Sequence, residues 1–402
     1  MLADLRHAWR ALRRSPGYLT AAVLTLALGV GATTALFGVV DRVLLRPLPY
    51  ADPARLVRVW PDQSTPDGLY ALLRARGPAY QALAAYGYPG EVSALAGDRP
   101  TRTVAVAVSG NLFATLGVAP RLGRALGEAD AAPHAAPAAV VSDAFWRDHL
   151  GADPRAVGRT LTLDGVAHEV VGVMPPRFAL PSARVAVWTA SRPDPANRGD
   201  YWWSWRNQLV GRLAPGATVE QAAGQSRAAA VRAGQESFPT RMNADYGRDL
   251  TVVPFQEDVV GGSRATLLIL LGGVLVMLAV AVMNVAGLSL VRAAGRAREV
   301  TVRAAVGATR GRLARQLVAE GVVVAALAAV VGGALAWGFT RLFVAALPPE
   351  GAAGALARAE EIGVDARALA AALVVALAAG VASALAPAVR ASRVDLRSAL
   401  AD

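Results

Sequence analysis

The sequence predicts an α-helical membrane protein with four transmembrane helices and one mixed α/β domain outside the membrane. Four apolar runs of at least 20 residues carry no charged side chain. A helix needs about 20 such residues to cross the ~30 Å of hydrocarbon in a bilayer. The first and second runs are 224 residues apart, enough for one large domain. The runs cover residues 15–40, 265–291, 321–340 and 368–389.

The arginines predict the orientation of these helices. All 41 basic residues are Arg, and three short segments, 1–14, 292–315 and 390–402, carry a net charge of +10 out of +11 for the chain. Basic residues beside membrane helices favour the cytoplasmic side. We therefore expect both termini and the 292–315 loop in the cytoplasm and the large domain outside it. This topology accounts for the excess charge, so no nucleic-acid partner is expected.

The predicted segments follow from the runs and the charges. The first run is too long for a signal-peptide core of about 7–15 residues, so we expect it to stay in the protein. The chain then divides into a cytoplasmic amphipathic helix (1–14), transmembrane helices (15–41, 263–291, 316–341 and 367–389), an extracytoplasmic α/β domain (42–262), a cytoplasmic coupling loop or helix (292–315), a short outer loop (342–366) and a cytoplasmic tail (390–402).

Two segments near the N-terminus have distinctive patterns. Residues 3–14 predict a helix with Leu5, Ala8, Trp9 and Leu12 on one face and arginines elsewhere, which suits the inner membrane surface. The first span is rich in Gly, Ala and Thr, and small residues let membrane helices approach closely. These small residues fit either packing within the chain's own bundle or a dimer contact.

The outer domain is expected to have two subdomains. A strand–helix–strand order with short connections favours an α/β subdomain, and a hairpin region over about 100–180 favours a β-rich one. Asp164-Gly165 predicts a type I′ turn, and Thr218 with Gln221 predicts a capping box. The expected elements are strands at 101–108, 209–213 and 250–253, a hairpin over 160–173 and a helix from Thr218 to about Gln235.

Three further patterns each fit more than one interpretation. Trp202, Trp203 and Trp205 lie in one aromatic run, which fits core packing, recognition of an outer partner or an interfacial belt. Asn284, deep in the second span, fits an interhelical hydrogen bond or part of a conduit. Gly261-Gly262, ahead of that span, is expected to form a hinge or linker.

Catalytic chemistry is not expected in this chain. A phosphate-binding P-loop needs Lys, and the sequence contains none. There is no Cys, and the four His residues are not paired at metal-ligand spacing. The outer acidic residues suggest no catalytic pair. We therefore expect no catalytic residue, metal or cofactor, although a membrane-anchored enzyme is the third hypothesis behind the two given below.

The 292–315 loop carries the pattern of a docking element. Glu299 and Arg303 are spaced i,i+4, and Val300, Ala304 and Ala308 fall on one helical stripe. A short helix along the cytoplasmic surface would suit a soluble partner, and a solvated basic loop is the alternative.

Several motifs resemble those of FtsX-like, MacB-type ABC transporter permeases. The motifs in and beside the loop are Asn284–Leu288 (NVAGL), Arg298–Arg303 (REVTVR) and Ala305–Thr309 (AVGAT). Residues 5–50, 109–124, 170–178 and 387–400 are also similar to parts of these permeases. The resemblance spans nearly the whole chain and is strongest to the acidobacterial duplicated orphan permease subgroup, here as a single unit.

The resemblance implies a function and partners. Such permeases have a coupling helix that docks on a separate or fused ATPase, and the matching residues here are Arg298, Glu299, Val300, Arg303, Gly307, Ala308 and Thr309. It implies a permease subunit of the bacterial inner membrane that transmits motion from a separate ABC ATPase to a MacB-like periplasmic domain, for export or efflux. The alternative is an FtsX-like regulatory module that controls an outer enzyme without transport.

The chain departs from the family pattern in two ways. It contains no fused ATPase and only one copy of the unit that the subgroup duplicates. We therefore expect a homodimer, or a heterodimer with a second permease, and a periplasmic or outer partner protein is also compatible with the family.

Overall fold

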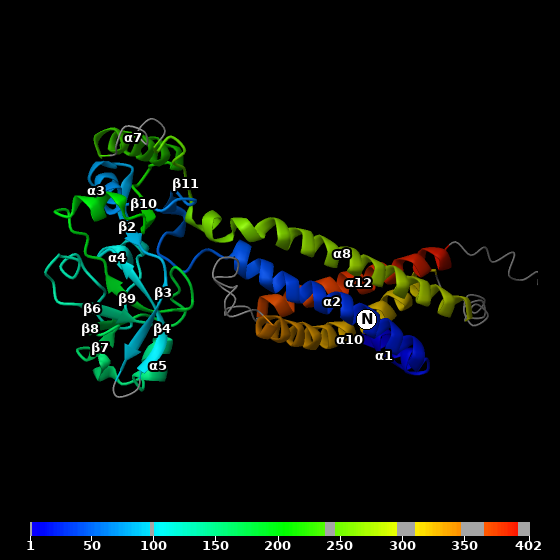
Figure 1. Cartoon of the computed structure of the whole chain (residues 1–402). Helices are drawn as coiled ribbons and strands as arrows, with labels where there is room; N and C mark the ends of the chain where they lie inside the picture. The colour runs from blue at the N-terminus through cyan, green and yellow to red at the C-terminus, as the bar shows by residue number, and fades with distance from the viewer. Residues whose placement is uncertain (1, 97–99, 238–245, 296–309, 347–365, 393–402) are drawn as a thin grey trace, which may run out of the picture. The chain divides into compact units, whose positions relative to one another are not determined.

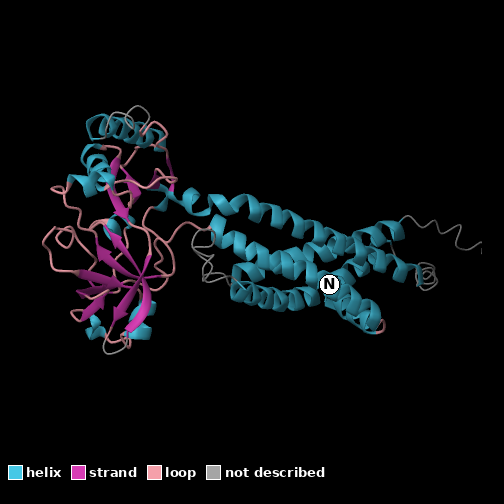
Figure 2. Cartoon of the chain, viewed as in Figure 1, coloured by secondary structure: helices cyan, strands magenta, loops and turns pink. Residues whose placement is uncertain are grey.

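The computed structural model describes residues 2–96, 100–237, 246–295, 310–346 and 366–392. These residues form two compact units, a helical unit built from residues before Pro47 and after Gly262, and an α/β unit between them. Figures 1 and 2 show the helices of the first unit and the sheet of the second.

Long helices make up the described part of the helical unit. They are α1 (Leu2–Arg13), α2 (Pro16–Val40), α8 (Phe255–Gly295), α10 (Arg310–Ala346) and α12 (Ala366–Ser392), and α2 continues as a π-helical turn over Asp41–Leu45. Within the described residues, four stretches are long and apolar enough to cross a membrane: Pro16–Leu45, Arg264–Gly295, Arg315–Leu342 and Arg367–Ala384.

Glycines bring the helices of this unit into close contact. A Cβ atom at Gly31 of α2 would lie 2.9 Å from the carbonyl oxygen of Gly332 on α10. Gly321 of α10 meets Gly380 of α12 in the same way, at 2.6 Å. Gly29 of α2 faces Leu278 of α8 instead. The small residues of the first span therefore pack within the chain's own bundle, one of the two alternatives predicted for them.

The α/β unit is built on one sheet of mixed direction. Among the described residues its strand order is β11-β1-β10-β2-β4-β3-β7-β8-β6-β9, with β5 paired to β8 and β4 also paired, in parallel, to β9. The strands are β1 (Leu56–Val59), β2 (Tyr80–Tyr86), β3 (Gly90–Leu95), β4 (Pro100–Val108), β5 (Leu122–Gly123), β6 (Ala138–Val141), β7 (Thr160–Leu163), β8 (Val166–Val173), β9 (Val185–Ala190), β10 (Gln208–Leu213) and β11 (Val252–Pro254).

Short helices cover the two ends of this sheet. In Figure 1, α3 (Asp67–Arg76) and α7 (Val219–Ser237) lie at one end, and α5 (Asp143–His149) lies at the other. Helices α4 (Leu112–Leu116) and α6 (Arg198–Trp203) complete the unit. Separate hydrophobic clusters form under the two ends, with a third between them. Because one sheet runs through all three, the two-subdomain division stays a prediction.

Local sequence signals predicted several of these elements correctly. Asp164 and Gly165 have φ values of 45° and 82°, both left-handed as a type I′ turn requires, and they join β7 to β8. At the start of α7, the Thr218 amide donates to Gln221 Oε1 at 3.0 Å and the Gln221 amide donates to Thr218 Oγ1 at 3.2 Å. The capping box is therefore confirmed, as are strands β4 and β10.

Gly261-Gly262 do not form a linker outside a helix, and the alternative of a hinge stays a prediction. Helix α8 begins at Phe255 and runs through both glycines without interruption. Phe255 and Val260 are buried, and Asp258 pairs with Arg58 of β1 at 3.5 Å. A glycine inside a helix destabilises it by only about 1 kcal/mol relative to alanine. The contacts of Phe255, Asp258 and Val260 therefore offset the cost of both glycines. The second long helix thus starts eight residues before the predicted boundary at residue 263.

The glycine contact between α2 and α10 leads to a testable prediction. Gly31→Ala should destabilise the protein by about 1–3 kcal/mol, because its methyl group meets a backbone oxygen that cannot turn away. Gly272→Ala on α8 is the matched control, since no atom lies within 4 Å of the place its methyl group would take. The melting temperature of the full chain in detergent should fall for the first variant and not for the second. Equal melting temperatures would contradict the close packing.

Candidate functional site

The predicted coupling residues lie outside the described residues. These are Arg298, Glu299, Val300, Arg303, Gly307, Ala308 and Thr309. The structure does describe the two helix ends that flank them, since α8 ends at Gly295 and α10 begins at Arg310. The candidate site is therefore built from the side chains that hold these two ends.

A buried charged pair joins the two helices, three residues before the end of α8 and ten residues after the start of α10. Arg292 Nη1 of α8 lies 3.1 Å from Glu320 Oε2 of α10, and each side chain is only 11% exposed. Arg292 Nη2 also donates to the backbone oxygen of Ala11 in α1 at 2.8 Å. Buried ions need such partners, because removal from water costs several kcal/mol per ion.

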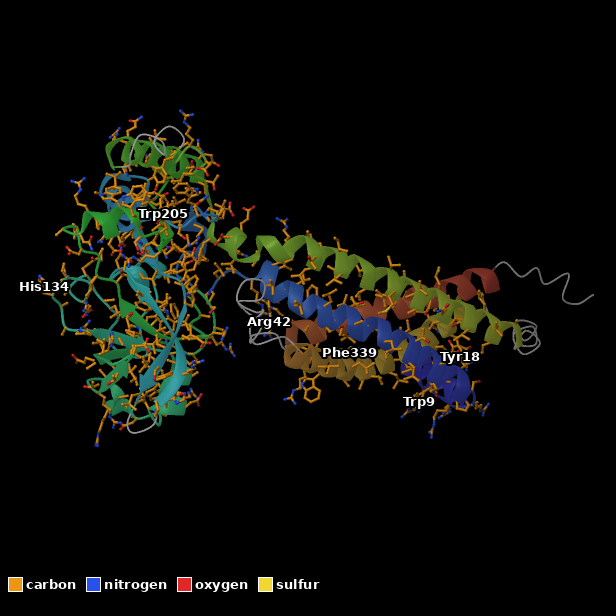
Figure 3. The ribbon with its side chains drawn as sticks, in the orientation of Figure 1. Trp9, Tyr18, Arg42, His134, Trp205 and Phe339 are labelled. Carbon is orange, nitrogen blue, oxygen red and sulfur yellow. The ribbon has the colours of Figure 1, made fainter. Side chains whose placement is uncertain are left out.

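An aromatic ring and a hydroxyl complete the surroundings of Arg292. Its guanidinium carbon lies 4.5 Å from the centre of the Tyr18 ring of α2, within cation–π range. The Tyr18 hydroxyl is hydrogen-bonded to Ser289 Oγ at 2.8 Å, and Ser289 donates to the Val285 carbonyl. Ala11, Tyr18, Ser289, Arg292 and Glu320 are called the Arg292 cluster below. It brings α1, α2, α8 and α10 together (Figure 3 labels Tyr18).

The Arg292 cluster was not predicted from the sequence. Glu320 directly precedes the third apolar run, a position that by itself suggests an interface anchor, and the structure pairs it with Arg292. The available signal was a basic residue directly after one apolar run and an acidic residue directly before the next. A second pair, Arg315 with Asp4 at 3.4 Å, also joins α10 to α1.

The aromatic run of the outer domain divides into packed and exposed side chains. Trp202 lies over Gly68, where a Cβ atom would come within 2.5 Å of the indole ring. Trp205 packs edge-on to Tyr246 at 5.7 Å between ring centres (Figure 3). Trp203 at the end of α6 is 45% exposed. Trp202 and Trp205 therefore serve packing, and Trp203 is the one of the three with a substantially exposed surface.

A buried carboxylate lies beside this run. Asn207 Nδ2 donates to Asp67 Oδ1 at 2.7 Å, and Arg206 Nη2 lies 3.4 Å from Asp67 Oδ2. Burial raises the pKa of the Asp67 carboxyl above its usual 3.8, against the opposing effects of Asn207 and Arg206. Asp67 thus begins α3 in an environment that disfavours its charge.

Two other predicted features concern polar groups. Asn284 is exposed on α8, and the predicted interhelical bond is not among those formed by the described residues. Among all residues that the structure describes, no group of three or more His, Cys, Asp or Glu is arranged to hold a metal ion.

Sequence families account for both units. The MacB-like periplasmic core domain matches residues 19–229, just over half of the chain, and the FtsX-like permease C-terminal domain matches residues 271–396. The class of protein is thus an ABC-type permease with a periplasmic core. The chain belongs to the MacB-like periplasmic core domain family and carries an FtsX-like permease C-terminal domain.

The comparison with solved structures finds matches to domains of permease and transporter proteins. A domain of a putative permease protein from Porphyromonas gingivalis is 17% identical, covers 51% of this chain and 93% of its own, and has a TM-score of 0.39. The periplasmic region of MacB from Actinobacillus actinomycetemcomitans is 11% identical, with coverages of 50% and 89% and a TM-score of 0.38.

A third similar structure is the extracellular domain of the noncanonic ABC-type transporter YknZ from Gram-positive bacteria. It is 9% identical, with coverages of 43% and 91% and a TM-score of 0.32. The comparison with curated proteins finds no match.

The Arg292 cluster yields a stability prediction. Arg292→Met should destabilise the full chain by about 3–5 kcal/mol, because it leaves the buried Glu320 carboxylate without this cation. The double variant Arg292→Met/Glu320→Met should recover most of the loss. Arg102→Met is the control, because Arg102 and Glu91 form an exposed pair worth about 0–1 kcal/mol. Melting in detergent measures all three, and a double variant as unstable as the single one would contradict the pairing.

Asp67 yields a pH prediction. The unfolded carboxyl has a pKa near 3.8 and the folded one a higher pKa, so between these values the folded state holds a proton that the unfolded state has released. Raising the pH through this interval should lower the free energy of unfolding of the wild type relative to that of Asp67→Asn. Above the folded-state pKa, the difference between the two proteins should no longer change with pH. Denaturant titrations at a series of pH values measure it. A difference that instead favours the wild type as pH rises would show that Arg206 outweighs burial.

Proposed function

We propose that this chain is the permease subunit of an ABC-type transporter that passes motion from a separate cytoplasmic ATPase to its extracytoplasmic domain, for export or efflux. One observation carries the proposal. Helix α8 runs unbroken from Phe255 to Gly295, which is about 60 Å at ~1.5 Å per residue. It begins in the core of the α/β unit and ends directly before the predicted coupling segment.

The outer end of α8 is held firmly by the sheet. Phe255 is buried in the central hydrophobic cluster, with its ring centre 6.1 Å from that of Tyr50. The buried Arg58 lies near Asp258 and donates to the Tyr86 hydroxyl at 2.8 Å. A displacement of α8 would therefore be passed to β1 through Arg58 and to β2 through Tyr86.

The inner end supports the same proposal. The ATPase contact is proposed at Arg298, Glu299, Val300, Arg303, Gly307, Ala308 and Thr309, between two helices that the Arg292 cluster joins. Because these contacts connect them, a movement of α8 or α10 would displace the other helix and also α1. In this mechanism the chain performs no catalysis, and its residues transmit force while the partner hydrolyses ATP.

The proposed setting is the bacterial inner membrane. We propose four spans, with both termini in the cytoplasm and residues 42–262 outside it. The arginine distribution and the four apolar helices support this topology. We further propose that the chain is a single-unit relative of the acidobacterial duplicated orphan permeases. It would then assemble as a homodimer, or with a second permease.

The exposed Trp203 favours a second candidate function. A tryptophan on the surface of the outer domain is a suitable contact for a partner protein. In an FtsX-like regulatory role, this domain would control an outer enzyme without moving a substrate. The two functions differ in what binds the outer domain. A pull-down with the full chain should recover a hydrolase in the regulatory case, and a substrate or tunnel protein in the transport case.

The ATPase contact has a direct test. The double variant Glu299→Arg/Arg303→Glu should lose co-purification with the candidate ATPase while it still inserts into the membrane, because both charges at the proposed contact are reversed. Glu91→Arg/Arg102→Glu is the matched control, since it reverses an exposed pair on the outer domain without altering the loop. Undiminished ATPase binding by the loop variant would refute the coupling proposal.

A further inference from the structure

The outward face of α1 is basic, and among the described residues it is exposed and does not pack against the other helices. Ala8 and Leu12 are fully buried, and Leu12 joins the cluster formed by α2, α8 and α10. Arg6, Arg10 and Arg13 fall on the opposite, exposed side at helical spacing. The apolar stripe of this amphipathic helix is therefore already covered, and its arginines face away from the bundle.

The acidic residue of α1 does not neutralise this face. Asp4 pairs with Arg315 of α10 at 3.4 Å, on the side of the helix that meets the bundle. The outward face thus presents several guanidinium groups together. Each guanidinium is a planar fork of donors that fits the oxygens of a phosphate, and it remains charged at any physiological pH.

Trp9 lies at the border between the buried stripe and the arginines. It is 40% exposed, and the guanidinium carbon of Arg13 lies 5.8 Å from the centre of its ring. Figure 3 shows Trp9 on the side of α1 away from the other helices. Tryptophan beside arginine is an arrangement suited to the membrane interface, where the ring meets the acyl chains and the cation meets the headgroups.

Residues near the two ends of helix α10 indicate where the two membrane interfaces lie. At one end Arg315 is paired with α1, and at the other Arg341 stacks on the exposed Trp337 at 4.3 Å. The 22 residue-to-residue steps from Arg315 to Trp337 span roughly 33 Å of helix at ~1.5 Å per step. This matches a hydrocarbon layer of about 30 Å, which puts α1 at headgroup depth.

We propose that the outward face of α1 binds anionic phospholipid headgroups, through Arg6, Arg10 and Arg13 and with Trp9 at the acyl boundary. Lipid is favoured over a protein partner because the tryptophan–arginine pair lies at headgroup depth and α1 is followed directly by a span. Zwitterionic lipids also carry phosphate, but only anionic lipids supply the net negative charge that attracts a basic helix. The proposal does not depend on the transport assignment.

The test uses the full chain in lipid nanodiscs. Acyl chains brominated near the headgroup quench tryptophan, and the contribution of Trp9 is the difference between the wild type and Trp9→Phe. At equal mole fraction, brominated phosphatidylglycerol should quench Trp9 more than brominated phosphatidylcholine does. The apparent local enrichment should be at least roughly fivefold, the effect expected for one basic residue at an anionic surface.

Variants and salt decide the outcome. Arg6→Gln/Arg10→Gln/Arg13→Gln should abolish the headgroup preference, whereas Arg155→Gln/Arg198→Gln/Arg232→Gln, exposed positions of the α/β unit, should retain it. For the unaltered chain, about 0.5 M NaCl should weaken the preference, because salt screens exposed charges. Equal quenching by both lipids, or a salt-independent preference, overturns the proposal. It is also overturned if the α1 variant keeps the preference but loses a protein partner, which would make this face a protein-docking surface.

Discussion

The exclusion of charge from hydrocarbon arranges the helical unit. The runs 15–40, 265–291, 321–340 and 368–389 contain no charged side chain, and the ions lie on either side of them. Where one of these ions is buried, as Arg292 is, it is surrounded by a carboxylate, a carbonyl oxygen and an aromatic ring. The cost of leaving such a group without partners forces α1, α2, α8 and α10 to meet at one place.

The same principle links the two ends of α8. At Asp258 and Arg58, in the α/β unit, a partly buried carboxylate and a buried guanidinium lie together, and burial raises the pKa of Asp258. At Arg292 a second charged pair ties the helix to α10. Between them the helix is almost entirely apolar. Charged pairs near both ends and an apolar length between them fit the role proposed for α8.

Sequence predicted what adjacent residues determine and missed what distant residues determine. The Asp164-Gly165 turn and the Thr218–Gln221 box were predicted because each depends on residues within four positions. The linker alternative for Gly261-Gly262 failed because Phe255 and Asp258 take partners from about 200 positions earlier, Tyr50 and Arg58. The sequence left the roles of Trp202 and Trp205 open for the same reason. Their packing partners, Gly68 and Tyr246, are distant in sequence and meet them only in the folded chain. The coupling residues of the candidate site came from a family resemblance, and they lie outside the described residues.

The glycine contacts give the helical unit uneven stiffness. Backbone meets backbone where Gly31 faces Gly332 and where Gly321 faces Gly380, so α2, α10 and α12 interlock with little room to shear. Helix α8 instead rests on α2 through the flexible side chain of Leu278 over Gly29. A leucine side chain can change its rotamer and a backbone oxygen cannot, so the contact of α8 with α2 can adapt to a small displacement more readily than the contact of α2 with α10.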